Sequence, residues 1–318
     1  MTTDVRYHRL RAMTWVLRVL IGLALAGAVR GCTSESSLKL VDLDDASAGG
    51  SGGGSGSGQG GAGGSAAGFG GADAGSDVTS DAVTGCPGSL TGPGLVEVPA
   101  PNGDTYCVDS TEVTNAQYAA FLARPPSASQ QPTECAWNTS FDPATSPLCS
   151  ERTDSVVRPN HPVVCVDWCD AVSYCAWAGK RLCGRMGGGA SDYLAVADPT
   201  ISQWYNACSA QGANSYPYGD AYEAQTCNGG DFSADDVVPV RDAAACHGPS
   251  APWSAIYDLS GNAMEWEDAC EASSGIDDAC RLRGGAFGHA ASNLRCDALG
   301  ALARNYRGIE VGFRCCLH

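Results

Sequence analysis

Residues 257–266 read YDLSGNAMEW and lie near the middle of the C-terminal half of this 318-residue chain. Gly and Asn side by side are typical of tight turns. Gly261 and Asn262 therefore predict a turn, and Glu265 follows closely enough to cap backbone amides nearby. Further motifs surround this turn in a fixed order: EVTNAQY at 112–118 with Phe121, HPVV at 161–164, VDW at 166–168, AVSYCAWAGKRL at 171–182, YPYGD at 216–220, LRGG at 282–285 and GFRC at 312–315.

Short regular elements and many turns characterise residues 86–318. Residues 95–99 and 105–109 alternate as strands do, and the segment 101–104 (PNGD) joins them as a turn. Thr114 predicts the start of a short helix that includes Tyr118, Phe121 and Leu122. Residues 124–160 are rich in Pro, Ser, Thr and Asp and predict a long loop, held by Cys135 and Cys149.

Two more helices follow. Asp167 and Asp170 approximate a capping box at the start of the clearest one, which ends at Gly179. Its predicted inner face consists of Val172, Cys175, Ala176 and Gly179. Another helix begins after Thr200, with an apolar face of Ile201, Trp204, Tyr205 and Cys208. The fold class is therefore α+β, in a single compact, disulfide-rich domain with much irregular structure.

The N-terminal part predicts export. Four arginines precede an apolar run at 19–29 that is too short to span a membrane, so residues 1–31 are typical of a signal peptide. Cys32 follows Gly31 and is a candidate for lipidation, although Arg30 occupies a position where lipoprotein signals prefer Ala or Ser; an ordinary secretory signal is the alternative. Residues 32–85 are mainly Gly, Ser and Ala and predict a disordered linker to the folded domain at 86–318.

Cysteine content and charge agree with export. The chain has 17 cysteines, too many for a reducing compartment at this length, and 16 remain if Cys32 carries lipid. Beyond residue 31 there are 14 basic and 34 acidic residues, a net charge of about −20. Such a surface repels nucleic acid. We therefore expect an exported protein, held at a membrane of the periplasm or cell surface by a lipid anchor and binding no nucleic acid.

In order and spacing, the motifs quoted above resemble the formylglycine-generating enzyme, or sulfatase-modifying factor, family. The resemblance covers about 210 residues and implies that family's compact architecture, which is related to C-type lectins. Its best-characterised members oxidise a sulfatase cysteine to formylglycine with copper, molecular oxygen and a pair of active-site thiols.

The chain departs from this family at the positions that carry the chemistry. His289 and Leu294 stand at the two thiol positions, Ala286 replaces a serine, and Glu310 replaces an asparagine. Thiolates suit Cu(I), so these changes remove the copper ligands. His289 and Cys296 remain as catalytic candidates.

The resemblance also implies disulfide pairs. Cys208 and Cys296 match one bridge of the family, which favours a structural role for Cys296 over a catalytic one, and Cys175 and Cys315 match a second bridge. Cys270 and Cys280 are a further candidate pair, because they close a short loop.

Calcium is the metal that the resemblance implies at the 257–266 turn. Hard Ca²⁺ prefers several oxygen ligands, which a turn provides through backbone carbonyls and Asn and Glu side chains. The expected ligands are Gly261, Asn262, Ala263 and Glu265, with Asn228 at a second site. A tight turn capped by Glu265 without a metal is the alternative.

Two functions follow as hypotheses. One is a divergent, calcium-stabilised domain that binds a protein or glycan at the cell surface without oxidising it. The other is a copper-dependent oxidase that makes formylglycine with a displaced thiol pair that includes Cys296.

Overall fold

The computed structural model describes residues 85–318. The predicted signal peptide, the lipidation candidate Cys32 and the linker up to residue 84 lie outside the described residues. From residue 85 onward, no helix is long and apolar enough to cross a membrane.

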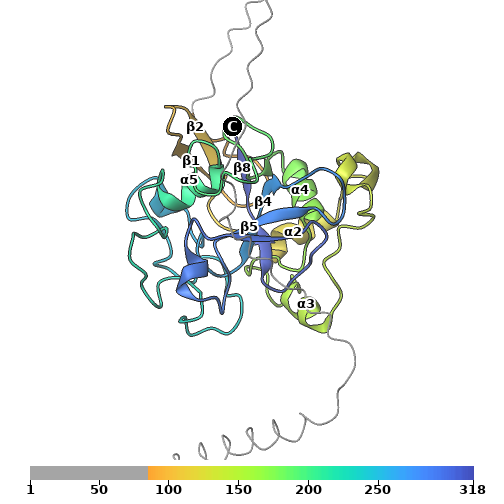
Figure 1. Cartoon of the computed structure of the whole chain (residues 1–318). Coiled ribbons are helices and arrows are strands. Elements are labelled where there is room, and N and C mark those ends of the chain that lie inside the picture. The colour runs from red at the N-terminus through yellow and green to blue at the C-terminus, as the bar shows by residue number, and fades with distance from the viewer. Residues whose placement is uncertain (1–84) are drawn as a thin grey trace, which may run out of the picture. The chain divides into compact units, whose positions relative to one another are not determined.

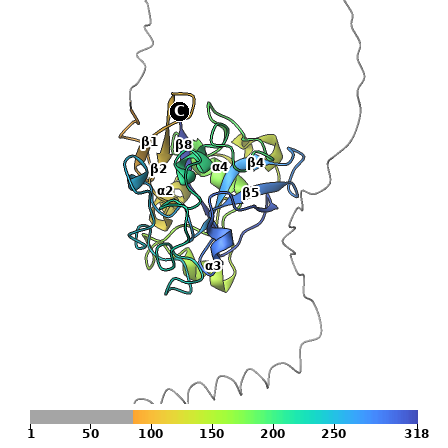
Figure 2. The same cartoon turned by 60° about the vertical axis from the view of Figure 1, so that its left-hand side comes forward.

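The first sheet contains the predicted hairpin. Strands β1 (Leu95–Pro99) and β2 (Thr105–Asp109) pair antiparallel over their full length, and their bounds are those expected from the sequence. The C-terminal strand β8 (Cys315–Leu317) pairs with β2 on one side and with β3 (Arg181–Leu182) on the other. Strand β8 is thus built into this sheet between β2 and β3, and Figures 1 and 2 show it next to β2.

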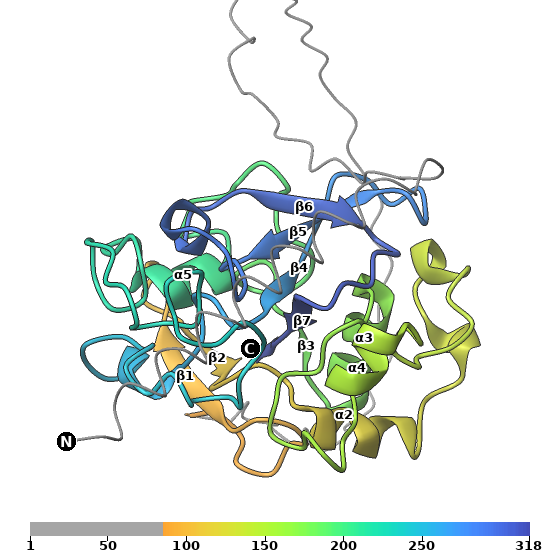
Figure 3. The same cartoon turned by 90° about the horizontal axis from the view of Figure 1, so that it is seen from below.

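The second sheet forms from the last third of the chain. Its order is β6 (Gly300–Ala303), β5 (Ala279–Arg283), β4 (Met264–Cys270) and β7 (Val311–Phe313), and Figure 3 shows the four strands side by side. Only β4 and β7 run parallel, with Met264 opposite Val311. The 257–266 motif therefore passes from a loop into a central strand of this sheet.

Three helices begin at or near the predicted caps. Helix α2 (Asn115–Leu122) has a capping box at Thr114, and α4 (Trp168–Trp177) has one at Asp167. Helix α5 (Gln203–Ser209) is capped by Ser202.

The predicted loop 124–160 contains a short helix, α3 (Pro147–Arg152), whose sequence signals are a Ser146 cap and a proline in the first turn. Four single-turn 3₁₀ helices complete the helical content of residues 85–318: η1 (Ala128–Gln130), η2 (Thr133–Cys135), η3 (Trp253–Ala255) and η4 (Ala291–Leu294).

The predicted inner face of α4 is partly wrong. Ala171, Tyr174 and Cys175 are buried in the main core, whereas Val172 is only half-buried and Ala176 is exposed. Tyr174 packs with Tyr118 and Phe313, so the large aromatic side chains determine which face turns inward. The smaller Val172 and Ala176 are left on the outer side.

All sixteen cysteines from Cys86 to Cys316 form disulfide bonds. The structure contains the three expected pairs, Cys175–Cys315, Cys208–Cys296 and Cys270–Cys280. The other five pairs are Cys86–Cys107, Cys135–Cys169, Cys149–Cys165, Cys183–Cys316 and Cys227–Cys246. Two of these join the irregular segment 124–160 to α4 and to the bend at Cys165 just before it, which accounts for its fixed course with little regular structure.

Candidate functional site

The turn at Gly261 and Asn262 lies against the segment that carries Asn228. Gly261 has a φ of +74°, and a Cβ there would approach the Asn228 carbonyl oxygen to 2.3 Å. The Asn262 amide donates a hydrogen bond to the same carbonyl at 2.8 Å. Glycine is therefore required at 261 both by the backbone angle and by this close approach.

The Asn262 side chain links three segments of the chain. Its Nδ2 donates to Glu112 Oε1 at 3.0 Å, and its Oδ1 accepts hydrogen bonds from Asn228 Nδ2 at 3.0 Å and from the Val238 amide at 2.9 Å. Asn262 is completely buried. It therefore positions Glu112 and Asn228 rather than offering a free oxygen of its own.

Glu265 is held by Arg314 in a fully buried ion pair. Arg314 donates from Nη2 to Oε1 at 2.6 Å and from Nε to Oε2 at 2.7 Å, and Trp204 Nε1 donates to Oε2 at 2.7 Å. Three donors thus satisfy this carboxylate. Glu265 comes from β4, Arg314 from the residue between β7 and β8, and Trp204 from α5, so the pair joins both sheets and a helix.

This region contains more buried acid than base. Glu112 and Asp258 lie near Glu265 and share Arg314 as their fully buried cation. Burial, followed by the charges of Asp258 and Glu265, raises the pKa of Glu112; burial raises that of Asp258 to about 7. Within residues 85–318, Glu112 Oε2 and Asn228 Oδ1 have no hydrogen-bond partner. A cation or a proton at this place would relieve the excess negative charge.

The expected calcium ligands fit this arrangement only in part. Asn262 and Glu265 already have their donors. Asn228, which was expected at a second site, lies against this turn and has a free oxygen. Glu112, which the sequence did not indicate, also has one. No three His, Cys, Asp or Glu side chains in the described part of the chain converge as a metal centre. An ion here would therefore take most of its ligands from amide and backbone carbonyl oxygens, including those of Gly261 and Ala263.

The two positions of the family's thiol pair lie beside the Asn228 segment. Leu294 is buried, and its side chain leaves no room for a Cβ at Gly229; a Cβ at Gly285 would meet the Asn293 carbonyl oxygen first. His289 is half-buried; its Nδ1 accepts a hydrogen bond from the Ala286 amide at 3.3 Å, and burial lowers its pKa while Glu310 opposes that shift. Glu310 in turn accepts a hydrogen bond from Tyr306 at 2.7 Å.

Within residues 85–318, no free cysteine thiol lies near His289 and Leu294. Cys296 is completely buried and bonded to Cys208, and the remaining cysteines from residue 86 onward are paired as well. His289 and Cys296 are therefore not brought together as a pair of metal ligands. The residues present do not fit a copper ion held by two thiolates.

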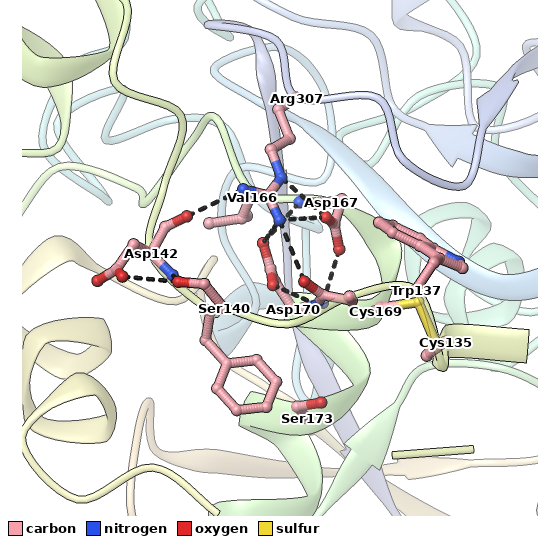
Figure 4. Close-up of polar contacts among 12 residues, drawn as sticks. Cys135, Trp137, Ser140, Asp142, Val166, Asp167, Cys169, Asp170, Ser173 and Arg307 are labelled. Carbon is pink, nitrogen blue, oxygen red and sulfur yellow. Dashed lines mark hydrogen bonds and ion pairs between the residues drawn. A yellow bond between two sulfur atoms is a disulfide. The ribbon is translucent and has the colours of Figure 1, made fainter. Parts of the chain in front are cut away.

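A second buried charge cluster fixes the segment that carries Glu310. Arg307 Nη2 lies 2.5 Å from Asp167 Oδ2 and 3.3 Å from Asp170 Oδ2, and Figure 4 shows the guanidinium reaching both carboxylates. Burial, together with the charge of Asp167, raises the pKa of Asp170 to about 8. The sequence identified the two aspartates only as a helix cap, because nothing in it links them to an arginine 140 residues away.

Comparison with known proteins agrees with the motif resemblance. The family model for the sulfatase-modifying factor enzyme 1-like domain matches residues 98–318. Formylglycine-generating enzyme of Bos taurus is 32% identical over 132 residues, covering 36% of this chain and 29% of the relative. Inactive C-alpha-formylglycine-generating enzyme 2 of Bos taurus is 32% identical over 113 residues, covering 33% of this chain and 32% of the relative.

The chain spans about a third or less of the length of these two relatives, so most of each relative has no counterpart in the matched region. Among solved structures, variable protein 1 of Treponema denticola has a TM-score of 0.45 and 17% identity, with 70% of this chain and 94% of that chain covered.

Proposed function

This chain belongs to the sulfatase-modifying factor family, and from that premise we propose that it is a non-oxidising member, exported and lipid-anchored through Cys32, that binds a protein or glycan at the cell surface. The observation that carries the proposal is the chemistry of the thiol positions. His289 and Leu294 occupy them, and the neighbouring Cys296 is bonded to Cys208. Passing electrons from a substrate thiol to oxygen needs a metal or thiol partner that this arrangement does not supply.

The eight disulfides support the export part of the proposal. Disulfides persist in oxidising compartments and are reduced in the cytosol. The acidic net charge of −16 for the whole chain supports a partner other than nucleic acid. One relative is itself named an inactive formylglycine-generating enzyme, so loss of activity has a parallel among the similar proteins.

Formylglycine formation is the second candidate, and the similarity to bovine formylglycine-generating enzyme favours it. The test is to incubate the purified full chain with copper, oxygen and a sulfatase-motif peptide and to search for the aldehyde by mass spectrometry. We expect no aldehyde above the level of a copper-only control. Turnover that is lost in Cys296→Ser would contradict the proposal and would assign Cys296 a catalytic role.

Calcium binding at the 257–266 turn is the remaining part of the proposal. It is supported by the excess buried acid and by the free oxygens of Glu112 and Asn228, with the Gly261 and Ala263 carbonyls as further ligands. A calcium ion would supply only structural charge neutralisation there. Asn262 would hold Glu112 and Asn228 in place, and Glu265 would keep Arg314.

We predict that saturating calcium raises the melting temperature at pH 7.5 by about 5 °C relative to chelator, because an ion that binds only the native state stabilises it by mass action. Glu112→Gln should abolish this response, since the amide keeps the shape and removes the charge. In chelator, the same variant should melt no lower than the wild-type protein. Glu151→Gln, at an exposed glutamate, is the control. A full calcium response in Glu112→Gln, measured by scanning calorimetry, would refute this site.

A further inference from the structure

A pocket of about 320 Å³ opens on the outer side of α4, away from the sites described above. Trp168, Val172 and Ala176 are spaced four residues apart and form one wall along the helix. Leu182 from β3, Pro132 and Ala190 supply further apolar surface. The volume is in the range of pockets that take small organic molecules.

Two carboxylates line this pocket without partners. Asp268 from β4 and Glu134 from η2 form no side-chain hydrogen bond or ion pair within residues 85–318. Burial raises the pKa of Asp268 to about 6, and the charge of Arg181 opposes that shift. The Asp268 carboxylate is therefore mainly ionised at neutral pH, in surroundings that disfavour its charge.

The basic residues of the lining do not balance both carboxylates. Lys180 contributes only its alkyl chain, because its Nζ lies 2.5 Å from Asp109 Oδ1, with both side chains completely buried. Arg181 directs Nη2 to Gln203 Oε1 at 2.6 Å and to the Arg185 carbonyl, whereas its buried Nε and Nη1 have no hydrogen-bond partner within residues 85–318. One guanidinium thus accompanies two carboxylates; with Lys180 neutralised by Asp109, the three remaining charged groups of the lining sum to about −1 at neutral pH.

We propose that this pocket binds an organic cation, an amine or guanidine attached to a compact apolar body. The apolar part would lie along Trp168, Val172 and Ala176, and the cation would pair with Asp268 and Glu134. Desolvated charge pairs of this kind are stronger than exposed ones. The inference does not depend on whether the domain oxidises a substrate, because the pocket shares no residue with the thiol positions or the 257–266 turn.

The test compares three probes of similar shape with the full chain at pH 7.5 and low salt. Phenethylamine is the cation, 2-phenylethanol the neutral analogue and phenylacetate the anion, and binding is followed by isothermal titration calorimetry and ligand-observed NMR. We expect phenethylamine to bind at least about tenfold more tightly than 2-phenylethanol, the factor that one charge-assisted contact provides. Phenylacetate should not bind. Preferred binding of phenylacetate would instead assign the pocket to anions through Arg181.

Single substitutions distinguish the contribution of the carboxylate charge to binding from that of the cavity itself. Asp268→Asn should remove the preference for the amine, and Ala176→Phe, at an exposed position of α4, should block all probes by filling the pocket. Asp235→Asn, at an exposed aspartate outside the pocket, should bind like the wild-type protein. The preference should also weaken as the pH falls from 7 to 5, because Asp268 takes up a proton while the amine keeps its charge. Unsaturable binding, or binding unchanged in Ala176→Phe, would overturn the proposal.

Discussion

Replacing Arg314 by methionine should lower the free energy of unfolding by about 3–5 kcal/mol, the cost typical of removing one partner of a buried ion pair. Arg314 is completely buried and donates to both oxygens of Glu265 and to the carbonyls of Asp109 and Tyr257. Methionine matches much of its volume and leaves Glu265, Glu112 and Asp258 without their shared cation. The decrease in the free energy of unfolding would therefore come mainly from the lost charge of Arg314 and only in small part from altered packing.

Urea unfolding of the full chain at pH 7 measures this loss. The matched control is Arg295→Met, because Arg295 pairs with Asp297 at 2.7 Å but both side chains are more than a third exposed. Exposed pairs contribute at most about 1 kcal/mol, so the control should change little. If Arg314→Met does not fold well enough to measure, Arg314→Lys keeps the charge and should show a smaller loss. Equal effects of Arg314→Met and Arg295→Met would contradict the assignment of a buried charge centre.

The double variant Cys208→Ser/Cys296→Ser should also be strongly destabilised, by about 4–5 kcal/mol, because this bond restricts a long loop in the unfolded chain. The two cysteines are 88 residues apart, and the bond fastens α5 to the segment after Leu294. Serine keeps the approximate size of the side chain, so the loss reflects the missing cross-link.

Cys270→Ser/Cys280→Ser is the comparison, since those cysteines are only 10 residues apart on paired strands. The loop-length dependence predicts a loss smaller by about 2 kcal/mol for this short bridge. Guanidinium unfolding of both double variants under non-reducing conditions gives the difference. An equal or larger loss for the short bridge would show that strand pairing, rather than chain restriction, dominates at these sites.

Local sequence signals predicted the parts of the fold that depend on neighbouring residues. The β1–β2 hairpin and the caps Thr114 and Asp167 follow from turn and capping residues within a few positions, and the structure has them there. The strands β4 to β8 were not resolved individually, because each is short and its partners are distant in sequence. The parallel pairing of β4 with β7 joins residues almost 50 positions apart.

In the candidate site, too, the sequence indicated the local features but not the contacts between distant residues. The motif resemblance located Gly261, Asn262 and Glu265, but their roles depend on contacts that a motif does not contain. Asn262 binds Glu112 across 150 residues, and Glu265 binds Arg314 across 49. These contacts change Asn262 from an expected ligand into a residue that positions other groups. The unpartnered oxygen of Glu112 could have been predicted only if the segment 112–118 had been known to pack against the 257–266 turn.

The folded domain should have no thiol available for oxidation chemistry, and this can be measured by counting the free thiols. The purified full chain, without reductant, is denatured and labelled with iodoacetamide, and the labels are located by peptide mass spectrometry. Eight disulfides predict no label on any cysteine from Cys86 to Cys316, and the burial of the Cys208–Cys296 bond predicts no label on Cys296 after mild reduction of the native protein. Stoichiometric labelling of Cys296 under either condition would show a poised thiol beside the family's active-site position, and the domain would then not lack oxidation chemistry on this ground.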